Sequence, residues 1–183
     1  EMCIRDRLDS LADVITSGLA PAAVLWQVCL QTEPCWLPEG WKLGYGVFVL
    51  AAFSALRLAK FNIDETQTVE FCGLPTPAGS LLCASLGMLW QQGMLALSSD
   101  GVLLVAVLTS LLLVSPIRMF ALKFHGFGWR GNEVRYLFLL ASIVLIIILR
   151  TYAIPVIIVL YIVVSAVRWL CMRSGNPDKA PKA

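Results

Sequence analysis

The sequence predicts an all-α membrane protein, a polytopic helix bundle with about six transmembrane helices. Of its 183 residues, 58% are hydrophobic and only 14% are charged, whereas a soluble domain is about half apolar and about a quarter charged. The mean hydropathy is +0.79, and the apolar residues gather into long runs. The net charge of +2 is too small to favour binding to nucleic acid.

Six apolar segments are each close to the ~20 residues with which an α-helix crosses the hydrocarbon core of a bilayer. In lipid they must be helical, because a helix satisfies its own backbone hydrogen bonds. We expect Pro21, Pro116 and Pro155 to kink or cap helices rather than to end the spans. The predicted spans cover residues 9–31, 43–61, 77–97, 101–122, 134–150 and 153–171.

The basic residues predict the orientation of these spans. If the Asp9 end faces the cytoplasm, that side carries twelve Lys and Arg residues and the other side only Lys42 and Arg150, as the positive-inside rule expects. The loops 62–76 and 123–133 then share the cytoplasmic side with Asp9. The loop 32–42 on the opposite side contains two tryptophans, which is typical of an interfacial aromatic belt. The twelve basic residues are Arg5, Arg7, Arg57, Lys60, Arg118, Lys123, Arg130, Arg135, Arg168, Arg173, Lys179 and Lys182.

The first span begins with an acidic pair. Asp9 and Asp13 lie four residues apart, so they share one face of a helix. Two carboxylates at the membrane boundary could bind a divalent cation through hard oxygen ligands. The small and polar residues that follow, Thr16, Ser17 and Gly18, suit a cavity better than a lipid-facing helix. The alternative is an ordinary acidic turn that the helix dipole favours.

The second span ends in a basic pair. Arg57 and Lys60 lie three residues apart in the stretch RLAKFN, so they share one helix face. They could bind a phosphate group that reaches a cavity. The alternative is that both side chains extend along the span to reach the interface.

Two further stretches are predicted on the cytoplasmic side. In GLPTPAG, residues 73–79, the glycine and the prolines predict a stiff loop that leads into the third span. This loop is either a simple turn or, together with Thr76, one wall of a site. The aromatic and basic residues of 120–138 favour an anchor at anionic lipid headgroups.

Several of these stretches together resemble a known family. LDSLADVITSGLAPA, residues 8–22, resembles the second half of the CDP-alcohol phosphatidyltransferase signature, D-x-x-D-G-x-x-A-R followed by G-x-x-x-D-x-x-x-D. Asp9 and Asp13 match its last two aspartates. LRLAKFNIDETQTVEFCGLPTPA, residues 56–78, is similar to the segment that marks the membrane-integral bacterial phosphatidylserine synthase branch. SPIRMFALKF and WRGNEVRYLF resemble the same branch.

The resemblance implies roles for the acidic and basic pairs. Asp9 would be a ligand of Mg²⁺ or Mn²⁺, and Asp13 either a metal ligand or the base that takes the proton from the acceptor hydroxyl. Arg57 and Lys60 would bind substrate through their positive charge. The implied reaction transfers the phosphatidyl group from CDP-diacylglycerol to L-serine and releases CMP. The alternatives are a sibling enzyme that uses glycerol 3-phosphate or inositol phosphate, and a degenerate relative without activity.

The resemblance also implies a setting for the reaction. We expect a homodimer in contact with membrane lipid in the bacterial inner membrane, with the site facing the cytoplasm. The family domain would cover 8–172, and 173–183 reads as a disordered tail. The first half of the signature is absent, and Arg5 stands where the family has a glycine. We therefore interpret 1–7 as a truncated or foreign start, discount Asp6 as a ligand, and expect the chain as given to be nearly inactive.

Overall fold

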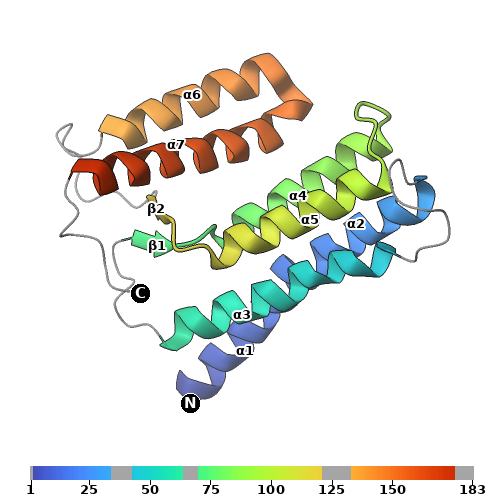
Figure 1. The fold of residues 1–183 in the computed structure, drawn as a ribbon, viewed down its shortest axis with the longest axis horizontal. Coiled ribbons are helices and arrows are strands. Elements are labelled where there is room, and N and C mark those ends of the chain that lie inside the picture. Colours follow the sequence, from blue (N-terminus) through green and yellow to red (C-terminus); the bar gives the residue numbers. More distant parts are fainter. Residues whose placement is uncertain (1, 34–42, 64–69, 121–132, 176–183) are drawn as a thin grey trace.

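The computed structural model describes residues 2–33, 43–63, 70–120 and 133–175, which are almost entirely helical (Figure 1). This confirms the predicted all-α class. The α-helices are α1 (Met2–Val14), α2 (Ala20–Gln31), α3 (Val49–Ile63), α4 (Thr76–Gln91), α5 (Ser99–Val114), α6 (Glu133–Leu149) and α7 (Ala153–Gly175). The π-helical turn η1 (Ile15–Leu19) joins α1 to α2, and the 3₁₀ turns η2 (Leu43–Phe48) and η3 (Arg150–Tyr152) precede α3 and α7.

The helices form a bundle of α1 to α5 with a hairpin of α6 and α7 beside it (Figure 1). In the bundle α3 packs against α5 and η1, and α2 packs against α4. The hairpin joins the bundle through α7, which contacts α4. Apolar side chains from several helices fill the core, among them Leu25 of α2, Leu50 of α3 and Val102 of α5. At the start of α5 the hydroxyl of Ser98 caps the helix by accepting a hydrogen bond from the Gly101 N–H.

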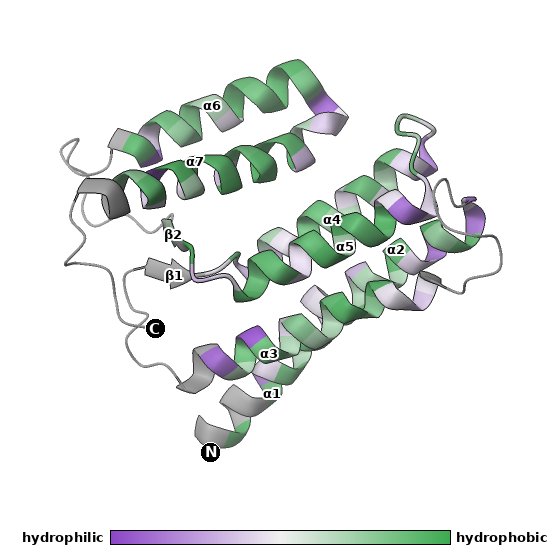
Figure 2. Cartoon of the chain, viewed as in Figure 1, coloured by the Kyte–Doolittle hydropathy of each residue, from purple (hydrophilic) through white to green (hydrophobic). Residues whose placement is uncertain are grey.

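Many large apolar side chains lie on the outer surface. Among the described residues, the helical stretches Leu8–Gln31 and Val134–Cys171 are long and apolar enough to cross a membrane. The second stretch turns back at η3, so it forms two helices; at about 1.5 Å per residue, α6 is about 25 Å long and α7 about 35 Å. Large apolar side chains on α6 are exposed, such as Ile147 at 71%, and Figure 2 shows that most of α6 is hydrophobic. A water-facing surface of this kind would be costly, so these features indicate a membrane protein.

Each of the six predicted spans contains a helix, but two spans were predicted too long. The span 77–97 was wrong at its end, because α4 stops at Gln91 and Gly93 adopts a left-handed conformation with φ +69°. The span 101–122 was also wrong, because α5 stops at Val114. Pro116 therefore does help to end a helix: Ser115 before it has ψ 143°, as steric conflict with a following proline favours.

The other expectations about helix ends have mixed outcomes. Pro21 lies in the first turn of α2 and Pro155 in the first turn of α7, so neither ends its span, as expected. The backbone of α7 continues to Gly175, into the region predicted as a disordered tail. The tryptophans of 34–42, the loop 123–133 except for Glu133, and residues 176–183 lie outside the described residues.

A small antiparallel ribbon was not predicted from the sequence. The strands β1 (Glu70–Cys72) and β2 (Arg118–Phe120) pair so that Glu70 faces Phe120. Directly after β1, the Gly73 N–H donates to the Ile117 carbonyl and the Leu74 N–H donates to the Leu112 carbonyl, each at 2.9 Å. The start of α4 is thereby tied to the end of α5.

Gly73 is required at this connection for two reasons. Its φ of +78° is left-handed, and a Cβ there would lie 2.3 Å from the Leu113 carbonyl oxygen. We expect Gly73→Ala to lower the free energy of unfolding by about 1 kcal/mol for the conformation and by about 1–3 kcal/mol more for the steric conflict. Denaturant or thermal unfolding in detergent measures this change.

Gly93→Ala is the matched control for this prediction. Gly93 has φ +69°, but a Cβ there would meet nothing within 4 Å. We expect only the conformational cost for this variant. Equal destabilisation by the two substitutions would show that the contact with Leu113 does not constrain the connection.

Candidate active site

One end of the bundle brings the predicted site segments together. The first helix α1, the end of α3, the ribbon and the start of α4 all lie at this end (Figure 1). Contacts between α1 and α3 and between η1 and α4 hold them there. This is the end at which the predicted orientation places the acidic pair, the basic pair and the GLPTPAG loop.

The acidic pair lies on the exposed side of α1. Asp9 and Asp13 are both exposed, and within the described residues neither makes an ion pair. Their oxygens suit Mg²⁺, which is commonly held by one or two carboxylates together with substrate phosphates and water. No group of three or more His, Cys, Asp or Glu side chains that could hold a metal is found among the residues that the structure describes.

The π-helical turn η1 sets the distance between α1 and α3. Gly18 in this turn lies against α3, where a Cβ would be 2.9 Å from the Cβ of Ser54. This close approach brings the helix with the carboxylates beside the helix with the basic pair. Ser54 is fully buried, and its hydroxyl has no hydrogen-bond partner in the described part of the chain.

Arg57 lies one helical turn after Ser54 and points into the bundle. It is half-buried, and its Nη1 donates a hydrogen bond of 2.6 Å to Thr76 Oγ1. Thr76 occupies the first position of α4 and is 2% exposed. The buried Nε of Arg57 has no hydrogen-bond partner among the described residues. An inward guanidinium of this kind does not extend toward the interface.

Lys60 differs from Arg57 although the two share a helix face in the sequence. Its side chain is exposed, and no described residue holds it in place. The structure therefore brings Arg57, but not Lys60, into contact with the GLPTPAG loop. No hydrogen bond or ion pair joins Arg57 to Asp9 or Asp13 within the described residues, so both charges are available to a ligand.

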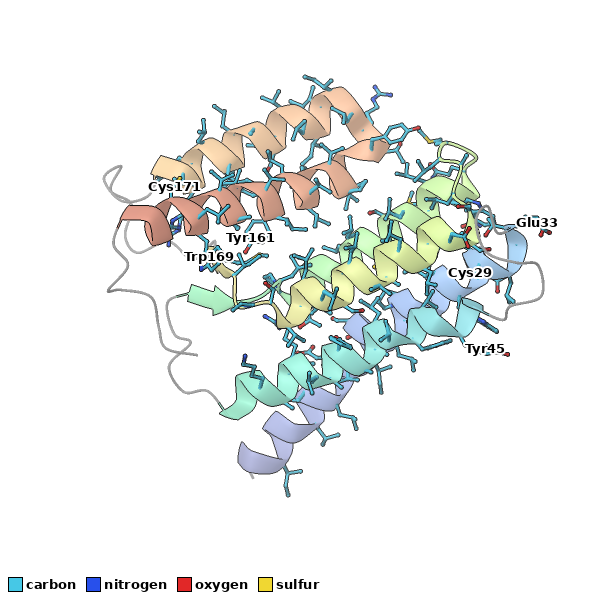
Figure 3. All side chains as sticks on the ribbon, in the orientation of Figure 1. Cys29, Glu33, Tyr45, Tyr161, Trp169 and Cys171 are labelled. Carbon is cyan, nitrogen blue, oxygen red and sulfur yellow. The ribbon has the colours of Figure 1, made fainter. Side chains whose placement is uncertain are left out.

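Helix α7 adds a side chain that the sequence analysis missed. Tyr161 points from α7 toward the bundle (Figure 3); it is 7% exposed and packs edge-on against Phe138, with ring centroids 5.9 Å apart. Its side chain lies in the same part of the bundle as Arg57, and Ser165 follows one helical turn later on α7. The sequence did contain a signal for this side chain, because Tyr161 and Ser165 are polar residues one helical turn apart in an otherwise apolar span.

The side chains at this end of the bundle are suited to bind a charged substrate. Carboxylates on α1 can bind a cation, and the guanidinium on α3 can bind a phosphate or carboxylate group. The Thr76 hydroxyl accepts a hydrogen bond from that guanidinium, and the Ser54 hydroxyl lies on the same helix as Arg57.

Comparison with known proteins finds several similar sequences, although no family model matches the chain. The CDP-diacylglycerol–serine O-phosphatidyltransferase of Mycobacterium tuberculosis (strain ATCC 25618 / H37Rv) is 34% identical over 96% of this chain and 64% of its own length. The protein of that name from Bacillus subtilis (strain 168) is 31% identical over 65% of this chain and 60% of its own length. The protein of that name from Helicobacter pylori (strain ATCC 700392 / 26695) is 29% identical over 88% of this chain and 66% of its own length.

The chain thus spans about two thirds or less of the length of these relatives. Within that span the similarity is broad, since it covers 96% of the chain in one relative and 88% in another. The chain is therefore similar to CDP-diacylglycerol–serine O-phosphatidyltransferases over most of its length, which supports its assignment to the CDP-alcohol phosphatidyltransferase family.

Proposed function

We propose that the protein transfers the phosphatidyl group of CDP-diacylglycerol to L-serine, giving phosphatidylserine and CMP. The observation that carries this proposal is the similarity to proteins named for that reaction over up to 96% of the chain. The gathering of carboxylates and a guanidinium at one end of an apolar bundle supports it, because the donor combines a charged diphosphate with apolar acyl chains.

In this proposal the acidic pair activates the acceptor. Asp9 and Asp13 would hold Mg²⁺ or Mn²⁺, and such an ion, when bound, neutralises a diphosphate and stabilises the leaving CMP. As an alternative to ligation, Asp13 would accept the proton of the serine hydroxyl. The hydroxyl oxygen then forms a bond to the phosphorus that carries the diacylglycerol, and the bond from that phosphorus to CMP breaks. Arg57 and Lys60 would bind the phosphate groups or the serine carboxylate.

The membrane arrangement is part of the same proposal. All six helical segments would cross the bacterial inner membrane, with the site at the cytoplasmic end where the basic residues gather. The lipid donor would then enter from the bilayer, and CMP and serine would exchange with the cytoplasm. A homodimer is proposed on the family resemblance alone.

The acceptor is tested by release of CMP from CDP-diacylglycerol in the presence of different alcohols. With the full-length natural protein and Mg²⁺ or Mn²⁺, we expect L-serine to support release, and glycerol 3-phosphate and inositol phosphate to support little. Release with glycerol 3-phosphate but not with serine would favour a sibling enzyme. Absence of release with every acceptor and both metals would favour a relative without activity.

The role of Asp13 is tested by Asp13→Asn in the full-length protein. We expect CMP release to fall by a factor of about 10²–10⁴, which is the usual loss when a general base is removed, while the melting temperature stays close to that of the wild type. Glu33→Gln is the matched control, because Glu33 is also an exposed carboxylate but follows α2 at the other end of the bundle. Turnover at the wild-type rate in Asp13→Asn would show that this carboxylate is not needed.

The 183-residue chain itself is expected to be a poor enzyme. Two exposed carboxylates hold a divalent ion only weakly when no further ligand is near. We expect little serine-dependent CMP release from the isolated chain at millimolar Mg²⁺. Robust release from it would contradict this expectation and show that Asp9 and Asp13 suffice.

A further inference from the structure

We propose that Thr76 is a positioning residue for Arg57: its hydroxyl holds Nη1 and so aims the Nε edge of the guanidinium at an oxyanion of the substrate. This inference rests on the proposed function and adds to it a residue that acts through Arg57. The oxyanion is either the carboxylate of the amino-acid acceptor or the diphosphate of the lipid donor, since a guanidinium pairs with both.

The hydrogen bonds of Arg57 indicate which edge is available. Nη1 is used by Thr76 at 2.6 Å, whereas the buried Nε–H has no acceptor among the described residues. A buried donor without a partner is costly, and such groups are rare in folded proteins unless a ligand or water completes them. The Nε edge is also one that a carboxylate or phosphate can bridge with two parallel hydrogen bonds.

Thr76 is suited to hold a side chain in one orientation. It is 2% exposed, lies between Pro75 and Pro77, and is the first residue of α4. The hydrogen bonds of Gly73 and Leu74 to the end of α5 fix the connection just before it. The hydroxyl is therefore an acceptor at a nearly constant position.

The charge at this point also favours an anion. The N-terminus of a helix carries a partial positive charge, and Thr76 places the Arg57 guanidinium at the N-terminus of α4. Two positive groups meet there, while within the described residues Arg57 makes no ion pair with Asp9 or Asp13. An incoming oxyanion would neutralise both.

Tyr161 of α7 is buried against Phe138 in the same part of the bundle as Arg57. Arg57 is itself half-buried, and a hydrogen bond is stronger in such a poorly hydrated environment. The orientation that Thr76 imposes is therefore expected to matter for binding.

The test measures CMP release by the full-length protein while serine and CDP-diacylglycerol are varied in turn. Thr76→Val keeps the shape of the side chain but removes the acceptor. We expect it to raise KM for one substrate about tenfold, with a smaller change in kcat. Thr76→Ser should restore the wild-type KM. Thr109→Val is the control, because Thr109 is an equally buried threonine in α5 that makes no hydrogen bond to Arg57 among the described residues, and its KM values should not change.

The two KM values, one for serine and one for CDP-diacylglycerol, identify the oxyanion. A rise confined to KM for serine assigns the carboxylate, and a rise confined to KM for CDP-diacylglycerol assigns the diphosphate. A double-mutant cycle with Arg57→Lys, which keeps the charge but lacks the planar fork, separates positioning from general damage. If Thr76 acts through Arg57, Thr76→Val should add almost nothing in the Arg57→Lys background.

Three outcomes would overturn the inference while the wild type remains active with serine. They are unchanged KM values in Thr76→Val, an equal effect of Thr109→Val, and full additivity with Arg57→Lys. If Thr76→Val does not fold, the test uses Thr76→Ser and Arg57→Lys. A Thr76→Ser variant whose KM rises by the same factor in the wild-type and Arg57→Lys backgrounds would contradict the positioning role. A wild type that releases no CMP with serine would instead refute the proposed function, and this inference with it.

Discussion

The architecture of the candidate site depends on how the end of α5 satisfies its carbonyl groups. The last carbonyls of a helix have no partner within it, and Pro116 prevents α5 from continuing. The Leu112 carbonyl instead accepts the Leu74 N–H, and the Ile117 carbonyl accepts the Gly73 N–H. This connection requires a glycine, and it determines where α4 begins and hence where the Thr76 hydroxyl lies.

Polar side chains inside the bundle fall into two kinds. Ser85, Ser110 and Ser142 donate to carbonyl groups of their own helices, at 2.7 to 2.8 Å, so a local bond offsets their burial. Arg57 is different, because its bond reaches another helix and its Nε has no described partner. A charged group within an apolar helix bundle is costly and is usually functional. Its position is therefore the main structural reason for placing the site at this end.

The two ends of the bundle differ in how completely they are bonded. At the far end the Ser99 hydroxyl lies 2.6 Å from the Thr32 carbonyl oxygen and 3.2 Å from that of Cys29, and the Tyr152 hydroxyl donates to the Met94 carbonyl at 2.8 Å. These bonds join segments that are distant in sequence. The site end instead presents exposed carboxylates and the Arg57 guanidinium, whose Nε has no hydrogen-bond partner among the described residues. One end is built for stability, and the other keeps polar groups available to a ligand.

The sequence by itself determined the class of fold, the position of a helix in each of six apolar segments and the two charged pairs, because hydropathy and residue spacing are local properties. The predicted ends of α4 and α5 were too late. Helix α4 ends before Gly93, which adopts a left-handed conformation, and α5 ends before Pro116, which keeps Ser115 out of the helical conformation. Only the tertiary structure separated Arg57 from Lys60. Both residues carry the same charge on one helix face, yet Arg57 meets Thr76 across helices while Lys60 stays exposed. Tyr161 likewise comes into the same part of the bundle as Arg57 because α7 packs against α4, a contact between segments far apart in the chain that no local pattern encodes.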